Sequence, residues 1–299
     1  MNVLVIGGSG FLSGHVTRES LAAGHAVNVI TRGQRAVPEG ATAIIADRKD
    51  TDAFAGAIAR SGMKWDIAID CIGYSAADAE QDVNVIAPRC GHLVFVSTDF
   101  VFRSTNRPFP VDETFASFEN ELPYGKGKRA AELVILSAAG QLPVTVVRPC
   151  HIYGPGSLLG CLPLHGRDPK LIDRLRAGEI LKLVGGGHFL QQPIFAPDLA
   201  RLLLSCHGKP KAAGEIFMAA GPEVIESKRF YEIIADLLGV TAAFEEVRVA
   251  DFLRDNPEKH SFCCHRVYNT QKARDAGLVM PSTPLAAGLR EHVRSVVGA

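Results

Sequence analysis

The sequence lacks an excess of charge of either sign, because its 299 residues include 32 Lys and Arg against 32 Asp and Glu. This balance argues against the basic surface that a general nucleic-acid-binding protein needs. The chain also lacks any apolar run close to the roughly 18 residues that a membrane span requires. Residues 3–6 already have the composition of a core strand, so we expect neither a signal peptide nor a membrane anchor.

Cysteine is scarce and irregularly spaced, with seven residues in all. An odd, scattered set does not fit a disulfide framework and predicts reduced thiols in a cytoplasmic protein. Cys263 and Cys264 lie between His260 and His265, but adjacent cysteines match no common zinc spacing. We therefore expect no metal site, and we interpret residues 260–265 as a strand-edge segment of a small lobe.

Glycine is concentrated at the start of the chain. The run Val3–Ile6 indicates a buried strand, the glycine-rich segment Gly7–Gly10 follows at once, and apolar residues then recur at helical spacing. A strand, a glycine turn and a helix form a cradle for the pyrophosphate of a dinucleotide. Ser13 stands where a third glycine normally allows close packing of helix on strand, and we expect Gly14 to take over part of that role.

Strand-like and helix-like segments alternate through the first half of the chain. Strands are expected at 26–30, 41–46, 66–71, 92–97 and 144–147, with helices at 51–60, 76–89 and 123–139. This alternation predicts an α/β fold built on a Rossmann-type, doubly wound parallel sheet. In such sheets ligands bind beyond the carboxyl ends of the strands.

The second half is more irregular. Residues 151–192 are rich in glycine, proline and histidine, with a helix expected near 169–177. A helix at 198–206 and a strand at 215–218 indicate a return to the sheet, and a further helix is expected at 228–238. We therefore predict a dinucleotide-binding domain of residues 1–150 with returning segments at about 193–222. Residues 151–192 and 223–299 would form the smaller C-terminal substrate lobe.

The end of the second strand bears on cofactor choice. An acidic residue there would favour NAD, whereas this chain has Thr31, Arg32 and Arg35. A hydroxyl and two arginines suit the 2′-phosphate of NADP, so we predict NADP with NAD as the alternative. The arginines would otherwise be solvated loop residues. Asp47 and Arg48 end the third strand and are expected beside the adenine.

A second group of residues indicates proton-transfer chemistry. Tyr124 and Lys128 are four residues apart, which places them on one face of a helix. A nearby ammonium is expected to lower the pKa of the Tyr124 phenol, which makes it a usable proton donor or acceptor. Thr98 ends the fifth expected strand, where it can hydrogen-bond a substrate oxygen and hold it towards Tyr124.

With these motifs the chain resembles the extended short-chain dehydrogenase/reductase family, also called the NAD-dependent epimerase/dehydratase family. The resemblance spans nearly the whole length and includes Arg148–Gly156, Pro197–Ala200 and the tail from Thr270 to Pro281. It implies that Tyr124 is the general acid/base, that Lys128 also binds the nicotinamide ribose, and that Thr98 orients the substrate. The cofactor contacts that it implies are Gly7, Gly10, Phe11, Leu12, Thr31, Arg32, Asp47, Arg48, Cys71, Gly73, Lys128 and Pro149.

Within that family the catalytic stretch Ser97–Phe102 is similar to the Ser-Thr-Asp-Tyr-Val-Phe of dTDP-4-dehydrorhamnose reductases. Dehydratases of the family carry Asp-Glu after the threonine, whereas Phe100 here replaces the glutamate, so we do not expect a dehydratase. Gln191 stands where many sugar-nucleotide enzymes have an arginine for the diphosphate, which weakens the case for a nucleotide-sugar substrate. The expected substrate contacts are Asp99, Cys150, His151, Gln191 and Arg266.

Three functions follow from these features. The first is an NAD(P)-dependent oxidoreductase that reduces a ketone, or oxidises the matching alcohol, on a small polar substrate, sugar-like molecules included. An epimerase would use the same residues. The third is a non-catalytic cofactor-binding or RNA-binding scaffold, because Gln191 and the stretch around Asp47 are also similar to the chloroplast stem-loop-binding branch. The expected partner is a small molecule, with no nucleic acid or membrane, and a homodimer is a possible assembly.

Overall fold

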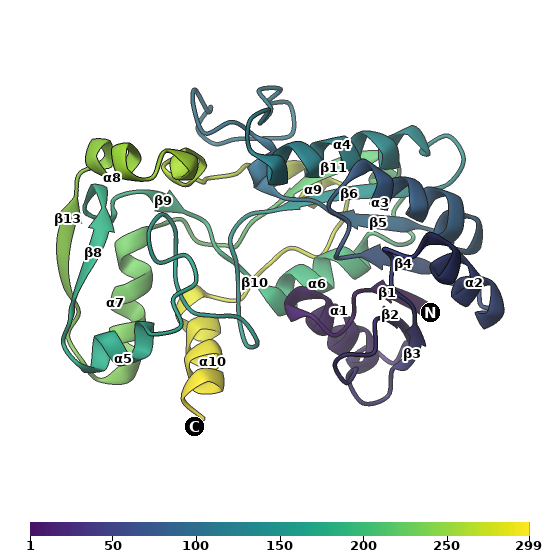
Figure 1. The fold of residues 1–299 in the computed structure, drawn as a ribbon, viewed down its shortest axis with the longest axis horizontal. Coiled ribbons are helices and arrows are strands. Elements are labelled where there is room, and N and C mark those ends of the chain that lie inside the picture. Colours follow the sequence, from purple (N-terminus) through teal and green to yellow (C-terminus); the bar gives the residue numbers. More distant parts are fainter. Residues whose placement is uncertain (299) are drawn as a thin grey trace.

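Seven parallel strands form the central sheet of the computed structural model, which describes residues 1–298 (Figure 1). Their order is β11-β6-β5-β4-β1-β2-β3, and every neighbouring pair is parallel. The strands are β1 (Asn2–Ile6), β2 (Ala26–Thr31), β3 (Thr42–Ile45), β4 (Ile67–Asp70), β5 (Leu93–Val96), β6 (Val144–Pro149) and β11 (Glu215–Ala219). The order reverses between β1 and β4, which is where such sheets bind ligands.

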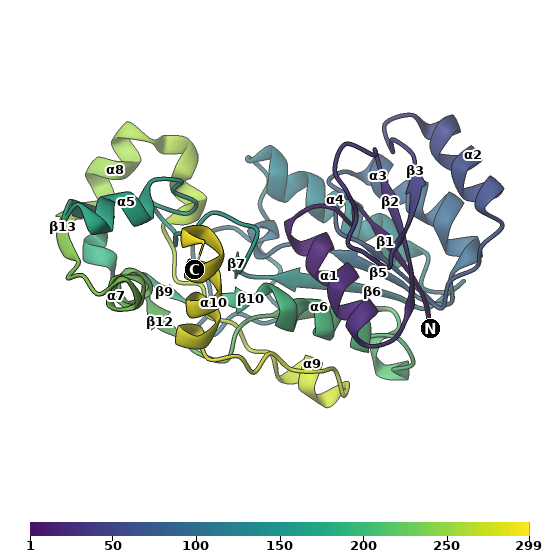
Figure 2. The ribbon, with the colours of Figure 1, turned by 90° about the horizontal axis from the view of Figure 1, so that it is seen from below.

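Helices cover both faces of this sheet, as Figures 1 and 2 show. Successive residues of a strand point to opposite faces, so Val3 and Val5 join one core while Leu4 and Ile6 join the other. The first core lies under α1 (Phe11–Ala22) and α6 (Ala196–Ser205), and the second lies under α2 (Thr51–Ser61), α3 (Ala76–Gln81) and α4 (Pro123–Ser137). The prediction of a Rossmann-type α/β fold is confirmed.

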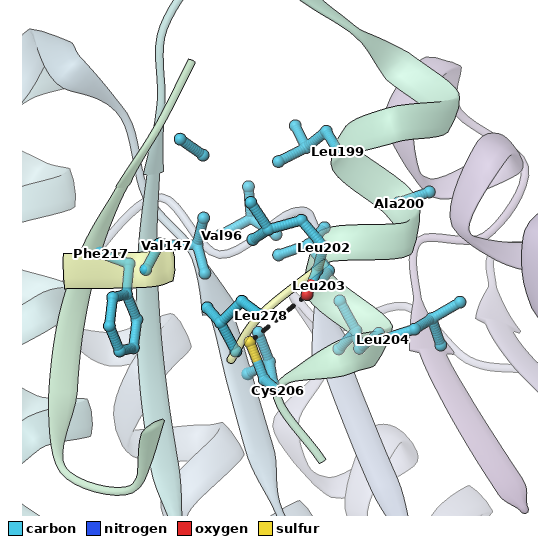
Figure 3. Close-up of a cluster of buried hydrophobic side chains, with 14 of the residues drawn as sticks. Val96, Val147, Leu199, Ala200, Leu202, Leu203, Leu204, Cys206, Phe217 and Leu278 are labelled. Carbon is cyan, nitrogen blue, oxygen red and sulfur yellow. Dashed lines mark hydrogen bonds between the residues drawn. The ribbon is translucent and has the colours of Figure 1, made fainter. Parts of the chain in front are cut away.

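Figure 3 shows the first of these cores in detail. Leu199, Leu202 and Leu203 of α6 are fully buried and face Val96 and Val147 of the sheet. Each fully buried leucine of this kind contributes about 1.5–3 kcal/mol. Burial on this scale anchors α6, and with it the returning segment, to the strands that carry the expected site.

A smaller lobe has a separate core beside the carboxyl ends of the strands. It contains the parallel pair β8 and β13, the parallel pair β7 and β10, the antiparallel pair β9 and β12, and four helices. The strands are β7 (Ile152–Tyr153), β8 (Ile180–Val184), β9 (Leu190–Gln191), β10 (Ile194–Phe195), β12 (Ile225–Glu226) and β13 (Ala243–Val247). The helices are α5 (Leu171–Arg176), α7 (Ser227–Leu238), α8 (Val249–Asp255) and α10 (Leu285–Val297).

The structure differs from the expected organisation in two places. Residues 257–262 form a 3-10 helix, so 260–265 is not the strand edge that we expected. Tyr268, Ala273 and Leu278 join the core under α6, and α9 (Gln271–Asp275) contacts β11. This part of the tail therefore packs on the Rossmann sheet, although the sequence pattern assigned it to the small lobe; Figure 2 shows α9 on that side.

Three general features concern the thiols, membrane-crossing helices and metal-binding groups of the chain. All seven cysteines are free thiols. Among residues 1–298, no helix combines the length and the hydropathy that crossing a bilayer requires. Over the same residues, no group of three or more His, Cys, Asp or Glu side chains is arranged to hold a metal ion.

Candidate active site

The glycine turn after β1 is tightly constrained. Gly7 has a φ of +97°, and a Cβ there would lie 2.5 Å from Ile72 Cγ2. A Cβ on Gly8 would overlap Val29 of β2, so this glycine permits the close helix–strand packing. A Cβ on Gly14 would meet only the flexible Arg18 side chain, at 3.4 Å, so Gly14 does not take over the role that we expected.

Ser13 has a different function from the glycine that it replaces. Its hydroxyl donates to the carbonyl oxygen of Gly7 at 2.5 Å and accepts from the amide of Gly10 at 3.0 Å. These two bonds close the turn from inside the first turn of α1. The remaining first-turn amides of the helix have no intrahelical acceptor, so they are available to an anion.

A groove of about 400 Å³ opens from this turn along the ends of β2 and β3. It is lined by Gly7, Ser9, Gly10, Ile30, Thr31, Arg32, Gln34, Arg35, Ala46, Asp47, Arg48, Lys49, Ile72 and Tyr74. Cavities of several hundred Å³ are typical of small-ligand sites. Glycine backbone at one end and arginines at the other fit the pyrophosphate and adenosine half of a dinucleotide.

Six predicted cofactor residues form this lining: Gly7, Gly10, Thr31, Arg32, Asp47 and Arg48. Phe11 and Leu12 begin α1 next to the turn, and Cys71 and Gly73 follow β4, but none of the four belongs to the lining, to which their neighbours Ile72 and Tyr74 contribute. The amide of Gly73 donates a hydrogen bond to Asp70 Oδ1 at 3.0 Å, and this bond closes a turn between β4 and Tyr74. Lys128 and Pro149 lie outside the lining, in α4 and at the end of β6.

Arg48 lines the groove where the adenine is expected, and its guanidinium is paired with protein carboxylates. Its buried guanidinium pairs with Asp70 and Asp82 at 3.0 Å each and with Asp78 at 3.4 Å. Burial works against its charge, but the three carboxylates outweigh burial and raise the pKa of Arg48. Arg48 therefore ties the loops after β3 and β4 together, whereas Arg32 and Arg35 remain exposed on the groove wall.

The helix that carries Tyr124 and Lys128 approaches its neighbours very closely. A Cβ on Gly125 would overlap the carbonyl oxygen of Phe100, and one on Gly127 would lie 2.6 Å from that of Tyr74. Glycine disfavours a helix by about 1 kcal/mol relative to alanine. Two glycines in one turn are therefore explained by contact with the loops that hold Thr98 and Tyr74.

Tyr124 lies at the carboxyl end of β5, between two aromatic rings. Its ring centroid is 6.3 Å from that of Tyr74 and 6.1 Å from that of Phe100, and 47% of the residue remains exposed. Burial raises the pKa of the phenol above its usual value, while the Thr98 side chain and the charge of Arg167 oppose the shift. The expectation of a lowered pKa is therefore wrong for the protein without cofactor.

The reason lies in where Lys128 points. Its buried Nζ donates to the carbonyl oxygen of Val96 at 2.7 Å and lies 4.8 Å from the Tyr74 ring centroid. Burial lowers the pKa of Lys128 to about 8, although the nearby Asp70 favours the charged form. The ammonium is thus held against the end of β5, on the same helix face as Tyr124.

Two expected substrate contacts, Asp99 and Arg266, are paired with each other. The Asp99 carboxylate accepts from the Arg266 guanidinium and from the Tyr268 hydroxyl, and all three residues are buried. Arg266 also stacks on Phe100, at 4.2 Å from the ring centroid. These side chains join the tail to the end of β5, so their charges are already paired within the protein, although we expected both residues to contact substrate.

Of the other expected substrate residues, Cys150 and His151 lie between β6 and β7, and Gln191 lies in β9. The Cys150 thiol donates to the carbonyl oxygen of Gln192 at 2.7 Å, and His151 Nε2 lies 3.0 Å from that of Gly160. Burial raises the pKa of Cys150 and lowers that of His151 to about 4. Gln191 is fully buried, and neither polar atom of its amide has a partner among residues 1–298.

Sequence patterns missed four residues around this site. Tyr74 and Tyr268 flank Lys128 and Asp99, Arg167 acts on Tyr124 through its charge, and Glu132 holds α4 to the sheet. Glu132 follows Lys128 by four residues, so helical spacing could have found it. The other three come from loops, where spacing carries no such information.

Comparison with known proteins agrees with this geometry. The sequence profile of the NAD dependent epimerase/dehydratase family matches residues 3–220. The chain is 22% identical to the chloroplast stem-loop binding protein of 41 kDa b of Arabidopsis thaliana over 275 residues, covering 87% of this chain and 67% of that protein. It is 28% identical to a 2-alkyl-3-oxoalkanoate reductase of Stenotrophomonas maltophilia over 242 residues, covering 70% and 69%.

A solved structure shares the fold across the whole chain. It is the dTDP-glucose 4,6-dehydratase of Bacillus anthracis in complex with NAD, with a TM-score of 0.79 and 19% identity, covering 100% of this chain and 97% of that one. The profile match covers more than half of the residues, and the groove lies where this fold binds its dinucleotide. The chain is therefore an enzyme of the NAD dependent epimerase/dehydratase family.

Proposed function

We propose that this protein is an NADP-dependent reductase that reduces a ketone, or oxidises the matching alcohol, on a small polar substrate. The observation that carries the proposal is the convergence of Thr98, Tyr124 and Lys128 at the end of β5, beside the dinucleotide groove. The reductase among the relatives supports this reaction class.

The residues of the site divide the work of such a reaction. Bound NADPH would supply the hydride. Thr98 would donate a hydrogen bond to the carbonyl oxygen, and Tyr124 would give it a proton as the carbon is reduced. A raised phenol pKa keeps Tyr124 protonated at neutral pH, which is the form that a reduction needs. Lys128 would hold the ribose with its ammonium.

Two features argue against other reactions of the family. Water elimination needs two acids after Thr98, but Asp99 is paired with Arg266 and Phe100 has no acid group. The uncharged Gln191 amide offers no charge to a diphosphate. An epimerase remains the alternative, since it uses the same three residues. It would keep its cofactor bound through both half-reactions.

The preference for NADP is part of the proposal. Arg32 and Arg35 are exposed on the groove wall next to Thr31, where the ribose 2′ position is expected. Charge-assisted bonds to a phosphate are strong enough to favour NADPH over NADH. We also infer a small-molecule partner without nucleic acid, from the zero net charge, and a reducing cytoplasmic setting, from the free cysteines.

The decisive experiment follows NADPH oxidation by absorbance with a panel of small polar ketones and keto sugars. Tyr124→Phe is expected to lower kcat by about 100- to 10,000-fold while NADPH binding, measured by fluorescence titration, is retained. Turnover of added NADPH indicates a reductase, and interconversion of epimers without net NADPH use indicates an epimerase. Equal turnover by Tyr124→Phe and the wild type would refute the role of Tyr124 in both reactions. A wild type that binds NADPH but shows neither turnover nor interconversion of epimers would favour a cofactor-binding scaffold.

A further inference from the structure

One carboxylate outside the expected catalytic set has an unusually complete environment. Glu132 of α4 is fully buried. Its Oε1 accepts from Ser97 Oγ at 2.6 Å and from Arg148 Nε at 2.8 Å. Its Oε2 accepts from Arg148 Nη2 at 2.7 Å and from Arg129 Nη1 at 2.8 Å. Both oxygens therefore have two donors, from α4, β6 and the residue that follows β5.

Glu132 lies on the same face of α4 as Tyr124 and Lys128, because the three residues are spaced by four. Lys128 reaches the carbonyl oxygen of Val96, and Glu132 reaches the hydroxyl of Ser97, the next residue. Thr98 follows directly. The helix is thus tied to two consecutive residues immediately before the one that faces Tyr124.

Two such ties fix both the depth and the rotation of a helix. Lys128 bonds to a single point at the end of β5, and the apolar packing of Ala131 and Ile135 is not directional. The bidentate pair with Arg148 adds a second strand, β6, to the attachment. A shift of about 1 Å at a reacting group can cost about 100-fold in rate, so an attachment of this kind has kinetic consequences.

We propose that Glu132 is a positioning residue, which sets the rotation of α4 so that Lys128 and Tyr124 meet the end of β5 in register. The inference rests on the proposed function, since it assigns Glu132 a part in the geometry of that reaction. Glu132 itself touches neither Thr98 nor the dinucleotide groove.

The pKa of Lys128 provides a second measurement, because a change in packing that leaves the charges in place would not shift it. The charged groups facing its ammonium are Asp70 from β4, Glu132 from α4 and Arg48 from the loop after β3. The remaining titratable neighbour, Cys71, has a pKa raised by burial and stays neutral. Loss of the Glu132 charge removes one of the two anions, so the pKa of Lys128 falls below its present value of about 8.

The test compares Glu132→Gln with Ser97→Ala, which removes one of the four donors and leaves the charges intact. Asp198→Asn serves as the matched control. Asp198 is also a buried helix carboxylate, bonded to Arg201 and to the backbone amides of Ser282 and Thr283, but it lies on α6. Melting temperature, kcat and KM over pH 6–10, and the titration of the Lys128 ¹³Cε signal are measured for each, with Lys128→Met assigning that signal.

Glu132→Gln is expected to lower kcat by about 10- to 100-fold and to move the alkaline limb of the pH profile and the Lys128 titration to lower pH. Ser97→Ala should lower kcat by a smaller factor without shifting the pKa of Lys128. If Glu132→Gln does not fold, the effect of Ser97→Ala on kcat tests the proposal in its place. Asp198→Asn should lower only the melting temperature. If Glu132→Gln and Ser97→Ala behave like this control, the proposal is overturned. A wild type without NADPH turnover would instead refute the proposed function, while the Lys128 titration still tests Glu132.

Discussion

Replacement of Gly125 by alanine separates helix propensity from the close approach of α4. Alanine in a helix interior is favoured over glycine by about 0.5–1 kcal/mol, so propensity alone predicts a more stable protein. At Gly125 the added methyl overlaps the carbonyl oxygen of Phe100 and lies 3.0 Å from Glu119 Cγ. A backbone carbonyl cannot rotate away, so the start of α4 has to move by roughly 1 Å.

The magnitude follows from these two opposing effects. Overpacking of this kind costs about 1–3 kcal/mol, and the upper part of that range applies because the added methyl group meets a backbone carbonyl oxygen and not a flexible side chain. After the propensity gain, Gly125→Ala is expected to destabilise the fold by about 2 kcal/mol, or about 4–8 °C in Tm. Because Tyr124 moves with the helix, kcat should fall by about 100-fold.

Gly56 offers a matched control in α2. A Cβ there meets only the flexible end of Arg60, at 3.0 Å, so Gly56→Ala should raise the melting temperature by about 2 °C and leave kcat unchanged. Differential scanning calorimetry and NADPH oxidation measure both quantities. If Gly125→Ala stabilises the protein as Gly56→Ala does and keeps its activity, then α4 does not need the close contact, and our account of the site is refuted.

Three further predictions concern other parts of the molecule. Arg32→Ala should raise KM for NADPH by about 10-fold, consistent with loss of a charge-assisted hydrogen bond, and leave KM for NADH unchanged; equal changes for both would show that Arg32 does not read the 2′-phosphate. Ser13→Ala should weaken binding of both cofactors, measured by fluorescence titration, because it opens the turn at Gly7; unchanged affinity would contradict this. Burial lowers the folded pKa of His92 to about 4, against 6.5 in the unfolded chain. The stability that this shift provides is complete above pH 6.5 and is lost as pH falls towards 4, by about 1.4 kcal/mol per pH unit. Urea titrations should therefore show a shallower acid dependence for His92→Gln, and an unchanged slope would refute the assignment.

Much of the Rossmann half was predictable because its signals are local. Alternation of short apolar strands with helices placed all seven strands of the sheet to within two residues at each end. The four-residue spacing of Tyr124 and Lys128 put them on one helix face, and the structure keeps them there at the end of β5. Repeating patterns of this kind depend on the geometry of a single element, so no knowledge of distant partners is needed.

Charged loop residues were less predictable, for a physical reason. Arg48 and Asp99 are in sequence positions that suit a ligand contact, but each is neutralised by residues far along the chain. A charge on a loop can be stabilised equally well by a ligand or by a buried partner, and spacing does not distinguish the two. The same limit applies to Tyr124, whose pKa depends on burial between Tyr74 and Phe100.

The class of fold, the glycine turn and the pairing of a phenol with an ammonium on one helix face follow from the spacing of neighbouring residues. Which charges remain free, and how closely α4 approaches the end of β5, depend on how the elements pack together. The same packing pairs Glu132 of α4 with Ser97 after β5, whereas Asp99 pairs with Arg266 of the tail. Those outcomes depend on contacts between residues of different elements, such as Ser97 with Glu132, which form only when the sheet and its helices assemble.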